Sequence, residues 1–161
     1  TRLRSRRAAW RALALSAVLL HLTAGAAYVA ALLHAPAPAP RPAGEVALAL
    51  PAAAALATGA SLVWLACAAL GLEGTLFGDY CGILMRRRVR DFPYDWLTHP
   101  QYVGLGLIDA GVALLSGRPV LGLGLCAWRS AWLLGVVATM EERHTRDTFR
   151  WIAKGKQKVE D

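Results

Sequence analysis

VALALPAAAALATGASLVWLACAALGL, residues 46–72, contains no charged side chain and is bounded by Glu45 and Glu73. A helix rises about 1.5 Å per residue, so this stretch is long enough to cross the roughly 30 Å of hydrocarbon in a bilayer. Pro51 lies near its start, where a missing amide donor costs little. We therefore predict a membrane-spanning helix over residues 46–72.

Three further apolar stretches lie on either side, at residues 8–33, 101–116 and 119–140. The last two are joined by the turn-forming sequence SGRP at residues 116–119, so we expect an antiparallel helical hairpin. The chain is 56% hydrophobic and only 18% charged, which is too apolar for an ordinary water-soluble domain. The sequence predicts an all-α polytopic membrane bundle of about four helices, forming a single domain over residues 1–161.

The stretch at residues 8–33 follows a group of arginines and could be mistaken for a signal peptide. It exceeds the roughly 7–15 apolar residues of a signal sequence, so we expect a retained helix. After it, residues 34–44 read HAPAPAPRPAG. Alternate prolines forbid a helix there and favour an extended polyproline linker.

Basic residues are bunched beside the apolar stretches, and the net charge is +7. Such bunches set membrane topology and attract anionic headgroups, and we favour this interpretation over nucleic-acid binding. With four spans, the N-terminal arginines, the cluster at residues 86–90 and the tail at residues 141–161 fall on one side. We therefore expect an integral membrane protein with both termini in the cytoplasm.

Two charged residues, Asp109 and Arg129, lie inside the predicted hairpin at matching distances from its turn. An unpaired charge in a membrane is costly, so we predict that they form an ion pair. The cysteines, Cys67, Cys81 and Cys126, are odd in number and show no Cys-x-x-Cys spacing. We expect free thiols and no metal site.

Residues 73–100 form a polar segment between the second and third spans, and we expect the chemistry to lie there. Gly74, Gly78 and Gly82 recur at every fourth residue. On a helix they would share a face and admit another backbone or a ligand. Plain helix packing is the alternative.

A second polar group begins the third span, where residues 99–104 read HPQYVG. The fourth span returns to the same face and ends in Glu141 and Glu142, which places two carboxylates near His99. Adjacent glutamates at a helix C-terminus oppose the macrodipole, so helix stability does not explain them. A ligand that presents hydroxyls or an ammonium would.

Several blocks of this sequence carry a family resemblance. They are GTLFGDYCGILM at residues 74–85, Pro100-x-Tyr102-x-Gly104, and the late pair Glu141-Glu142. Together they resemble the small membrane phospholipid N-methyltransferases, which act on phosphatidylethanolamine and phosphatidyl-N-methylethanolamine. The resemblance is dense from about residue 70 to residue 102 and thin but colinear over the later hairpin.

This resemblance implies S-adenosylmethionine as the methyl donor, a phospholipid headgroup amine as the acceptor and phosphatidylcholine as the end product. It also suggests the endoplasmic reticulum membrane, although a bacterial inner membrane suits the same physics. The chain lacks a strand followed by a glycine-rich turn and a helix, which excludes a Rossmann-type donor site. We therefore expect the donor to bind among helices.

The family's donor-site elements can be placed residue by residue. Its Gly-x-Gly element on the second span is incomplete here, because Ala57 stands in place of the first glycine. The Glu141-Glu142 element matches fully. The expected donor-binding residues are Gly59, His99, Tyr102, Gly104, Glu141 and Glu142.

The acceptor amine must lose a proton before attack, and Asp79, His99 or one of the glutamates can take it. Aromatic faces attract methylated ammonium groups, which suggests roles for the tyrosines and Trp96. A membrane-interface belt is the alternative for Trp96. We expect Asp79, Tyr80 and His99 to be catalytic, and Arg86, Arg88, Arg90 and Tyr94 to bind the lipid substrate.

Two other functions remain open. His99 precedes Pro100, and histidine at this position is typical of the isoprenylcysteine carboxyl methyltransferases, so esterification of a prenylated cysteine is one alternative. The other is a non-catalytic helical membrane protein that packs against partners or lipids through its glycines.

Overall fold

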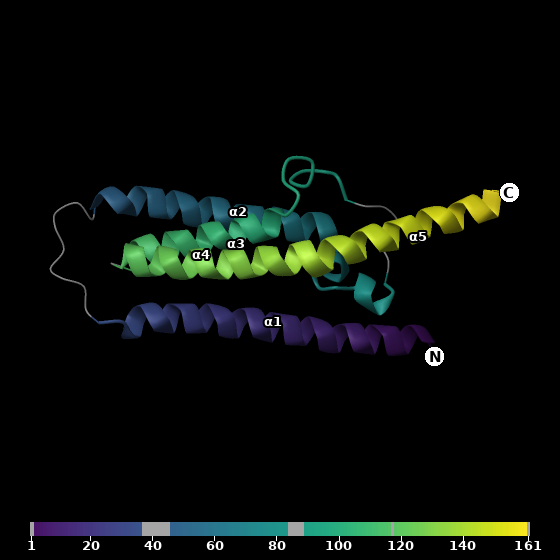
Figure 1. Ribbon diagram of the computed structural model, residues 1–161, viewed down its shortest axis with the longest axis horizontal. Coiled ribbons are helices and arrows are strands. Elements are labelled where there is room, and N and C mark those ends of the chain that lie inside the picture. Colours follow the sequence, from purple (N-terminus) through teal and green to yellow (C-terminus); the bar gives the residue numbers. More distant parts are fainter. Residues whose placement is uncertain (1, 37–45, 84–88, 117, 161) are drawn as a thin grey trace.

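The computed structural model describes residues 2–36, 46–83, 89–116 and 118–160, and all regular structure in these ranges is helical. Its elements are α1 (Arg2–His34), α2 (Val46–Thr75), η2 (Asp79–Cys81), α3 (Pro100–Leu115), α4 (Pro119–Val136), η3 (Val137–Glu141) and α5 (Glu142–Glu160). Helices α1 to α4 run alongside one another, and α5 continues the line of α4 beyond the bundle (Figure 1). The predicted all-α fold class is confirmed.

The boundaries of α2, α3 and α4 with η3 lie within a few residues of the predicted apolar stretches, whereas α1 begins at Arg2, before the predicted residue 8, and the predicted tail forms the polar helix α5. Helices α1 and α2 are long and apolar enough to cross a membrane, and α3 is a shorter apolar helix. Both α3 and α4 begin at a proline, Pro100 and Pro119. The fixed backbone angle of proline suits the first helical turn, where its missing N–H has no intrahelical partner to lose.

Helices α2 and α3 pack closely through glycines. A Cβ atom added to Gly59 would lie 2.5 Å from the carbonyl oxygen of Gly104, and one added to Gly104 would lie 2.7 Å from that of Gly59. Further along, Gly111 approaches Leu56 and the backbone of Ala52 in the same way. Small residues let helix backbones approach within a membrane. These contacts fix the position of α3 along α2.

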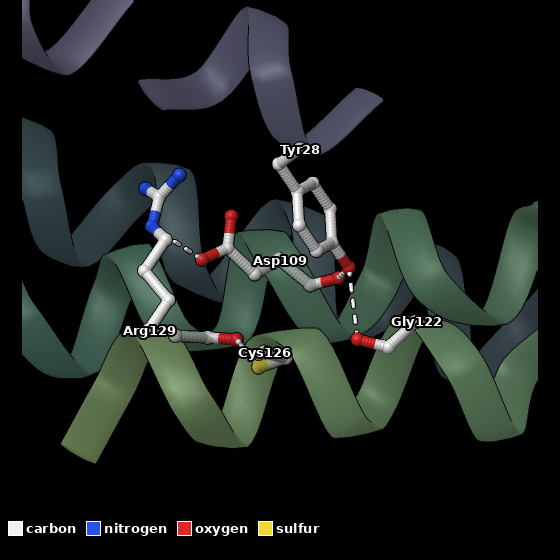
Figure 2. A network of polar contacts seen from close by, with 6 residues as sticks. Tyr28, Asp109, Gly122, Cys126 and Arg129 are labelled. Carbon is white, nitrogen blue, oxygen red and sulfur yellow. Dashed lines mark hydrogen bonds and ion pairs between the residues drawn. The ribbon is translucent and has the colours of Figure 1, made fainter. Parts of the chain in front are cut away.

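A buried ion pair joins the two helices of the C-terminal hairpin. Arg129 Nε lies 3.0 Å from Asp109 Oδ2, so the predicted pair is confirmed (Figure 2). Tyr28 of α1 shares its hydroxyl proton between the carbonyl oxygens of Asp109, at 2.8 Å, and Gly122, at 3.2 Å. The same network therefore also fastens α1 to the hairpin.

Helix α2 ends in a left-handed turn. The N–H of Gly78 donates to the carbonyl oxygen of Glu73 over 2.7 Å, and Phe77 has a φ of 60°. This is the Schellman pattern, in which glycine usually fills the left-handed position. A phenylalanine there is sterically unfavourable by roughly 1–2 kcal/mol.

The condition for a shared glycine face at residues 74, 78 and 82 is not met, because α2 is kinked at the left-handed residue Gly71 and no single helix carries all three glycines. Only Gly74 lies in α2, which ends at Thr75. Gly78 precedes η2, and Gly82 follows η2 with a φ of 71°. The expectation assumed one continuous helix, whereas the left-handed residue Phe77 ends α2 before the second glycine.

Both ends of the described chain lie toward the same end of the bundle as the segment between α2 and α3 (Figure 1). Here Trp10 Nε1 of α1 donates to the carbonyl oxygen of Leu76 over 3.0 Å. At the opposite end, the Arg118 guanidinium donates to the carbonyl oxygens of Ala35 and Pro36. The remainder of the predicted polyproline linker lies outside the described residues.

Candidate active site

Two side-chain pairs join the start of α3 to the end of η3 and the start of α5. Tyr102 Oη donates to Glu141 Oε2 over 2.7 Å, and His99 Nε2 lies 3.2 Å from Glu142 Oε1. These partners are 39 and 43 positions apart in the chain, so the hairpin brings them together. The predicted proximity of His99 to the two glutamates is confirmed.

Local structure places each of these side chains. Pro100 begins α3 and leaves His99 just before the helix. On the other side, the π-helical turn η3 ends at Glu141. A π-helical turn contains an extra residue, so it changes which side chains face a neighbour, and such turns recur at functional sites.

Both pairs line a cavity of about 380 Å³ at the polar end of the bundle. Small-molecule sites usually have volumes of roughly 300–1,000 Å³. The walls come from the end of α2, the turn into η2, the segment before α3, the first turn of α3, and α5. The ionisable side chains among the described lining residues are Asp79, Tyr80, Tyr94, His99, Tyr102, Glu141, Glu142 and Arg146.

Three aromatic side chains that line this cavity, Phe77, Tyr80 and Tyr94, are called its aromatic wall. The rings of Phe77 and Tyr80 meet edge to face, with centroids 5.7 Å apart. Burial raises the pKa of Tyr80, and the carboxylates of Asp79 and Glu141 add to the shift. Burial likewise raises the pKa of Tyr94. Both phenols therefore stay neutral at physiological pH and line the cavity as uncharged rings.

His144 of α5 packs against Tyr80 and was not among the site residues expected from the sequence. Its ring stacks on Tyr80 with centroids 3.8 Å apart and an interplanar angle of 17°. Its Nε2 lies 3.3 Å from Asp79 Oδ2, within ion-pair distance, although the two atoms are not aligned for a hydrogen bond. The signal that could have found it is its spacing from Glu141, which is about one helical turn.

The structure brings most of the expected site residues together. Asp79, Tyr80, Tyr94, His99, Tyr102, Glu141 and Glu142 all line the cavity. Gly59 and Gly104 instead face each other across the α2–α3 interface. Arg90 is exposed and is not a lining residue, whereas Arg146, which the sequence analysis passed over, is one. Arg86 and Arg88 lie outside the described residues.

Residues 48–151 match the protein family described as phospholipid methyltransferase. This range covers most of the chain's length and includes every described lining residue of the cavity. The chain belongs to the phospholipid methyltransferase family. The resemblance inferred from the motifs is thereby confirmed.

The names of individual relatives state which phospholipid each one methylates, and this phospholipid methyltransferase family member is compared with three of them. It is 45% identical to the phosphatidyl-N-methylethanolamine N-methyltransferase of Neurospora crassa over 75 residues, which are 47% of this chain and 35% of the relative. It is 48% identical to that of Saccharomyces cerevisiae over 50 residues, 31% of this chain and 24% of the relative. It is 37% identical to the phosphatidylethanolamine N-methyltransferase of Homo sapiens over 106 residues, 65% of this chain and 52% of the relative.

The chain thus spans about half or less of the length of these relatives. No solved structure gives a significant match to it. For this phospholipid methyltransferase family member, the geometry of the cavity is therefore the basis for assigning roles to individual residues.

Proposed function

We propose that this chain transfers methyl groups from S-adenosylmethionine to the headgroup amine of phosphatidylethanolamine or its monomethyl and dimethyl derivatives, leading to phosphatidylcholine. The observation that carries the proposal is a cavity at the polar end of an apolar bundle that is lined both by paired carboxylates and by the aromatic wall. The relatives are named for methylation of phosphatidylethanolamine and phosphatidyl-N-methylethanolamine, which supports the same class of acceptor.

The carboxylate side of the cavity suits the donor. S-adenosylmethionine carries an ammonium and ribose hydroxyls, and when bound it supplies a methyl group on a positively charged sulfur. Glu141 and Glu142 can accept hydrogen bonds from these groups. Tyr102 and His99 already hold the two carboxylates in place, so the side chains lose little conformational entropy when the donor binds.

The aromatic side of the cavity suits the acceptor. Phe77, Tyr80 and Tyr94 present faces that attract an ammonium, and this attraction does not require N–H groups, so it persists as methyl groups are added. Arg146 lines the same cavity and can bind the lipid phosphate. The cluster that contains Arg86, Arg88 and Arg90 is proposed to attract the phosphate at headgroup depth.

The reaction sets modest chemical demands on the protein. Transfer of a methyl group from a sulfonium to an amine is a displacement that needs no covalent protein intermediate, so positioning supplies much of the rate. The protein must hold the two reactants in line and remove a proton from the acceptor ammonium. Asp79 and His99 line the cavity and are candidates for that proton transfer.

We further propose that α1, α2, α3, and α4 with η3, all cross the bilayer. The opening of the cavity and both termini would then face the cytoplasm, in the endoplasmic reticulum or in a bacterial inner membrane. Two features support this arrangement: the ends of the described chain lie at one end of the bundle (Figure 1), and the sequence places basic residues at the start of α1 and along α5, which form those ends. At about 1.5 Å per residue, α3 is short for a span, and local thinning of the bilayer would accommodate it.

The decisive experiment is an acceptor comparison with detergent-solubilised protein and labelled donor. We expect transfer to phosphatidyl-monomethylethanolamine and none to a farnesylcysteine analogue. The reverse result would favour the isoprenylcysteine alternative, which His99 before Pro100 keeps open. Calorimetry that detects no donor binding at all would favour a non-catalytic membrane protein.

The role of Glu141 can be tested separately. We expect Glu141→Ala to abolish donor binding in calorimetry while expression and membrane insertion stay normal. Asp95→Ala is the matched control, because Asp95 is an exposed carboxylate in the segment before α3 and is not a lining residue. Near-normal donor affinity in the Glu141 variant would refute its assigned role.

A further inference from the structure

We propose that Asp79 and His144 form an acid–base pair that takes up the proton released at each methyl transfer and passes it to water. This inference rests on the proposed function, because methylation of an ammonium is the step that releases the proton. Asp79 lines the cavity, whereas His144 lies behind Tyr80 and is not a lining residue. His144 therefore acts through Asp79.

In this pair, the imidazole nitrogen His144 Nε2 can accept a hydrogen bond but receives none from the described residues. His144 Nε2 lies 3.3 Å from Asp79 Oδ2, and Nε2 is buried with no hydrogen-bond partner among the described residues. A buried nitrogen of this kind favours any state in which a donor faces it. Protonated Asp79 becomes such a donor after its carboxyl group turns to align the O–H with the free electron pair of a neutral imidazole, since the two atoms are already 3.3 Å apart.

Neighbouring groups hold both members in place. Stacking on Tyr80 fixes the imidazole ring. Asp79 Oδ1 accepts the backbone N–H of Tyr80 over 3.1 Å, which leaves Oδ2 for His144. Among the nearby charged groups, Glu141 acts electrostatically on Tyr80, and the Arg6 guanidinium of α1 approaches Gly82 just after η2.

The other carboxylates of the cavity are less suited to this role. Glu141 already accepts a hydrogen bond from Tyr102. Glu142 is hydrogen-bonded to His99, and its side chain is 45% exposed. Asp79 adjoins the aromatic wall, where the acceptor amine is expected to bind, so it is the carboxylate best placed to meet the departing proton.

The proposed step balances in atoms and charge. The acceptor ammonium gives one N–H proton to the Asp79 carboxylate, and the freed nitrogen electron pair forms the new C–N bond. The C–S bond of the sulfonium breaks with its electron pair left on sulfur. The proton then moves from Asp79 to His144 Nε2, and the imidazolium releases a proton to water. The His144 side chain is 31% exposed, so water can reach the ring.

The test uses full-length protein and phosphatidyl-dimethylethanolamine, which accepts a single methyl group. The rate at saturating donor is measured from about pH 5.5 to about pH 9.5. We expect the wild-type kcat to fall on the acid side, because a protonated imidazole cannot accept a further proton.

His144→Phe keeps a stacked ring without nitrogens. It is expected to lower kcat about 100-fold, to lose the acid-side decline and to leave the KM for the donor unchanged.

Chemical rescue provides the second measurement. His144→Gly leaves a ring-sized gap beside Tyr80, and added imidazole is expected to restore part of its activity. His21→Phe is the matched control, since His21 is an exposed histidine on α1, and it should keep the wild-type profile. Donor binding by calorimetry verifies that each variant is folded. Should phenylalanine impair donor binding, His144→Gln supplies a polar group that does not titrate.

Several results would overturn the pair. One is a His144→Phe protein that keeps the acid-side decline with a kcat within about twofold of wild type. Another is loss of that decline in His99→Phe but not in His144→Phe, which would assign the proton to the other histidine–carboxylate pair. Wild-type protein that methylates no phospholipid would refute the proposed function itself, and the pair with it.

Discussion

Tyr102 Oη donates a hydrogen bond of 2.7 Å to Glu141 Oε2, so a phenol in the first turn of α3 holds a carboxylate at the end of η3. The partners come from opposite arms of the hairpin, and both line the cavity. A hydrogen bond to a charged group contributes about 1.5–3 kcal/mol. Holding Glu141 in one orientation should therefore matter for any ligand that the carboxylate binds.

Tyr102→Phe keeps the ring and removes only this hydroxyl. We expect the dissociation constant for S-adenosylmethionine to rise roughly tenfold to a hundredfold. Without the hydroxyl, Glu141 is no longer held in its binding orientation, which weakens donor binding by about 1.5–3 kcal/mol. Isothermal titration calorimetry on detergent-solubilised protein measures this change. Tyr28→Phe is the control, since it removes a buried hydroxyl outside the cavity: it should lower the melting temperature and leave donor affinity intact.

The Asp109–Arg129 pair predicts a strong coupling within the hairpin. Asp109→Ala leaves the Arg129 guanidinium without its carboxylate, and removing one partner of a buried pair costs about 3–5 kcal/mol. Arg129 Nη1 is already buried without a hydrogen-bond partner among the described residues. We therefore expect a large loss of thermal stability in detergent for this single variant.

The double variant Asp109→Leu with Arg129→Met should recover most of that stability, because apolar replacement also removes the desolvation cost of both charges. A double-mutant cycle measures the coupling from the unfolding midpoints of Asp109→Leu, Arg129→Met and the double variant that combines them. Additive losses in the two single variants and the double variant would contradict the pairing.

The bundle and its hairpin register could be predicted from the sequence because two independent signals agree. Hydropathy locates the apolar helices. Because an unpaired charge inside such a helix is costly, Asp109 and Arg129 are expected to form an ion pair. Once that pair fixes the register, His99 and Glu142 necessarily fall at the same end. The structure confirms this consequence with the contact between His99 and Glu142.

Two parts of the site could not be predicted in this way. The glycines at 74, 78 and 82 do not themselves show where α2 stops, and the stop depends on Phe77 adopting a left-handed conformation that its residue type disfavours. His144 lies in a polar stretch whose composition indicates only a tail. Its position against Tyr80 depends on α5 continuing from η3, which no periodicity in the spans reveals.

The glycine contact between α2 and α3 predicts a steric limit. Gly59→Ala would place its Cβ 2.5 Å from the carbonyl oxygen of Gly104, so the helices must separate. Overpacking of this kind costs about 1–3 kcal/mol, and we expect a lower unfolding midpoint.

Gly124→Ala on α4 is the matched control, because nothing lies within 4 Å of its added Cβ. Alanine is the better helix former by up to about 1 kcal/mol, so this control should be neutral or stabilising. Equal effects at both sites would mean that α2 and α3 are not in close contact.

Phe77 combines backbone strain with a place in the aromatic wall, and two substitutions separate these properties. Phe77→Ala removes the ring but keeps a side chain at a φ of 60°, whereas Phe77→Gly removes both the ring and the strain. Because the left-handed conformation costs a non-glycine residue roughly 1–2 kcal/mol, we expect the glycine variant to be the more stable by about 1 kcal/mol in thermal unfolding. Both variants should raise the KM for phosphatidyl-dimethylethanolamine to a similar extent, because both lose the ring face that attracts the ammonium. An alanine variant as stable as the glycine variant would show that residue 77 is not left-handed, and unchanged KM values would remove Phe77 from the acceptor site.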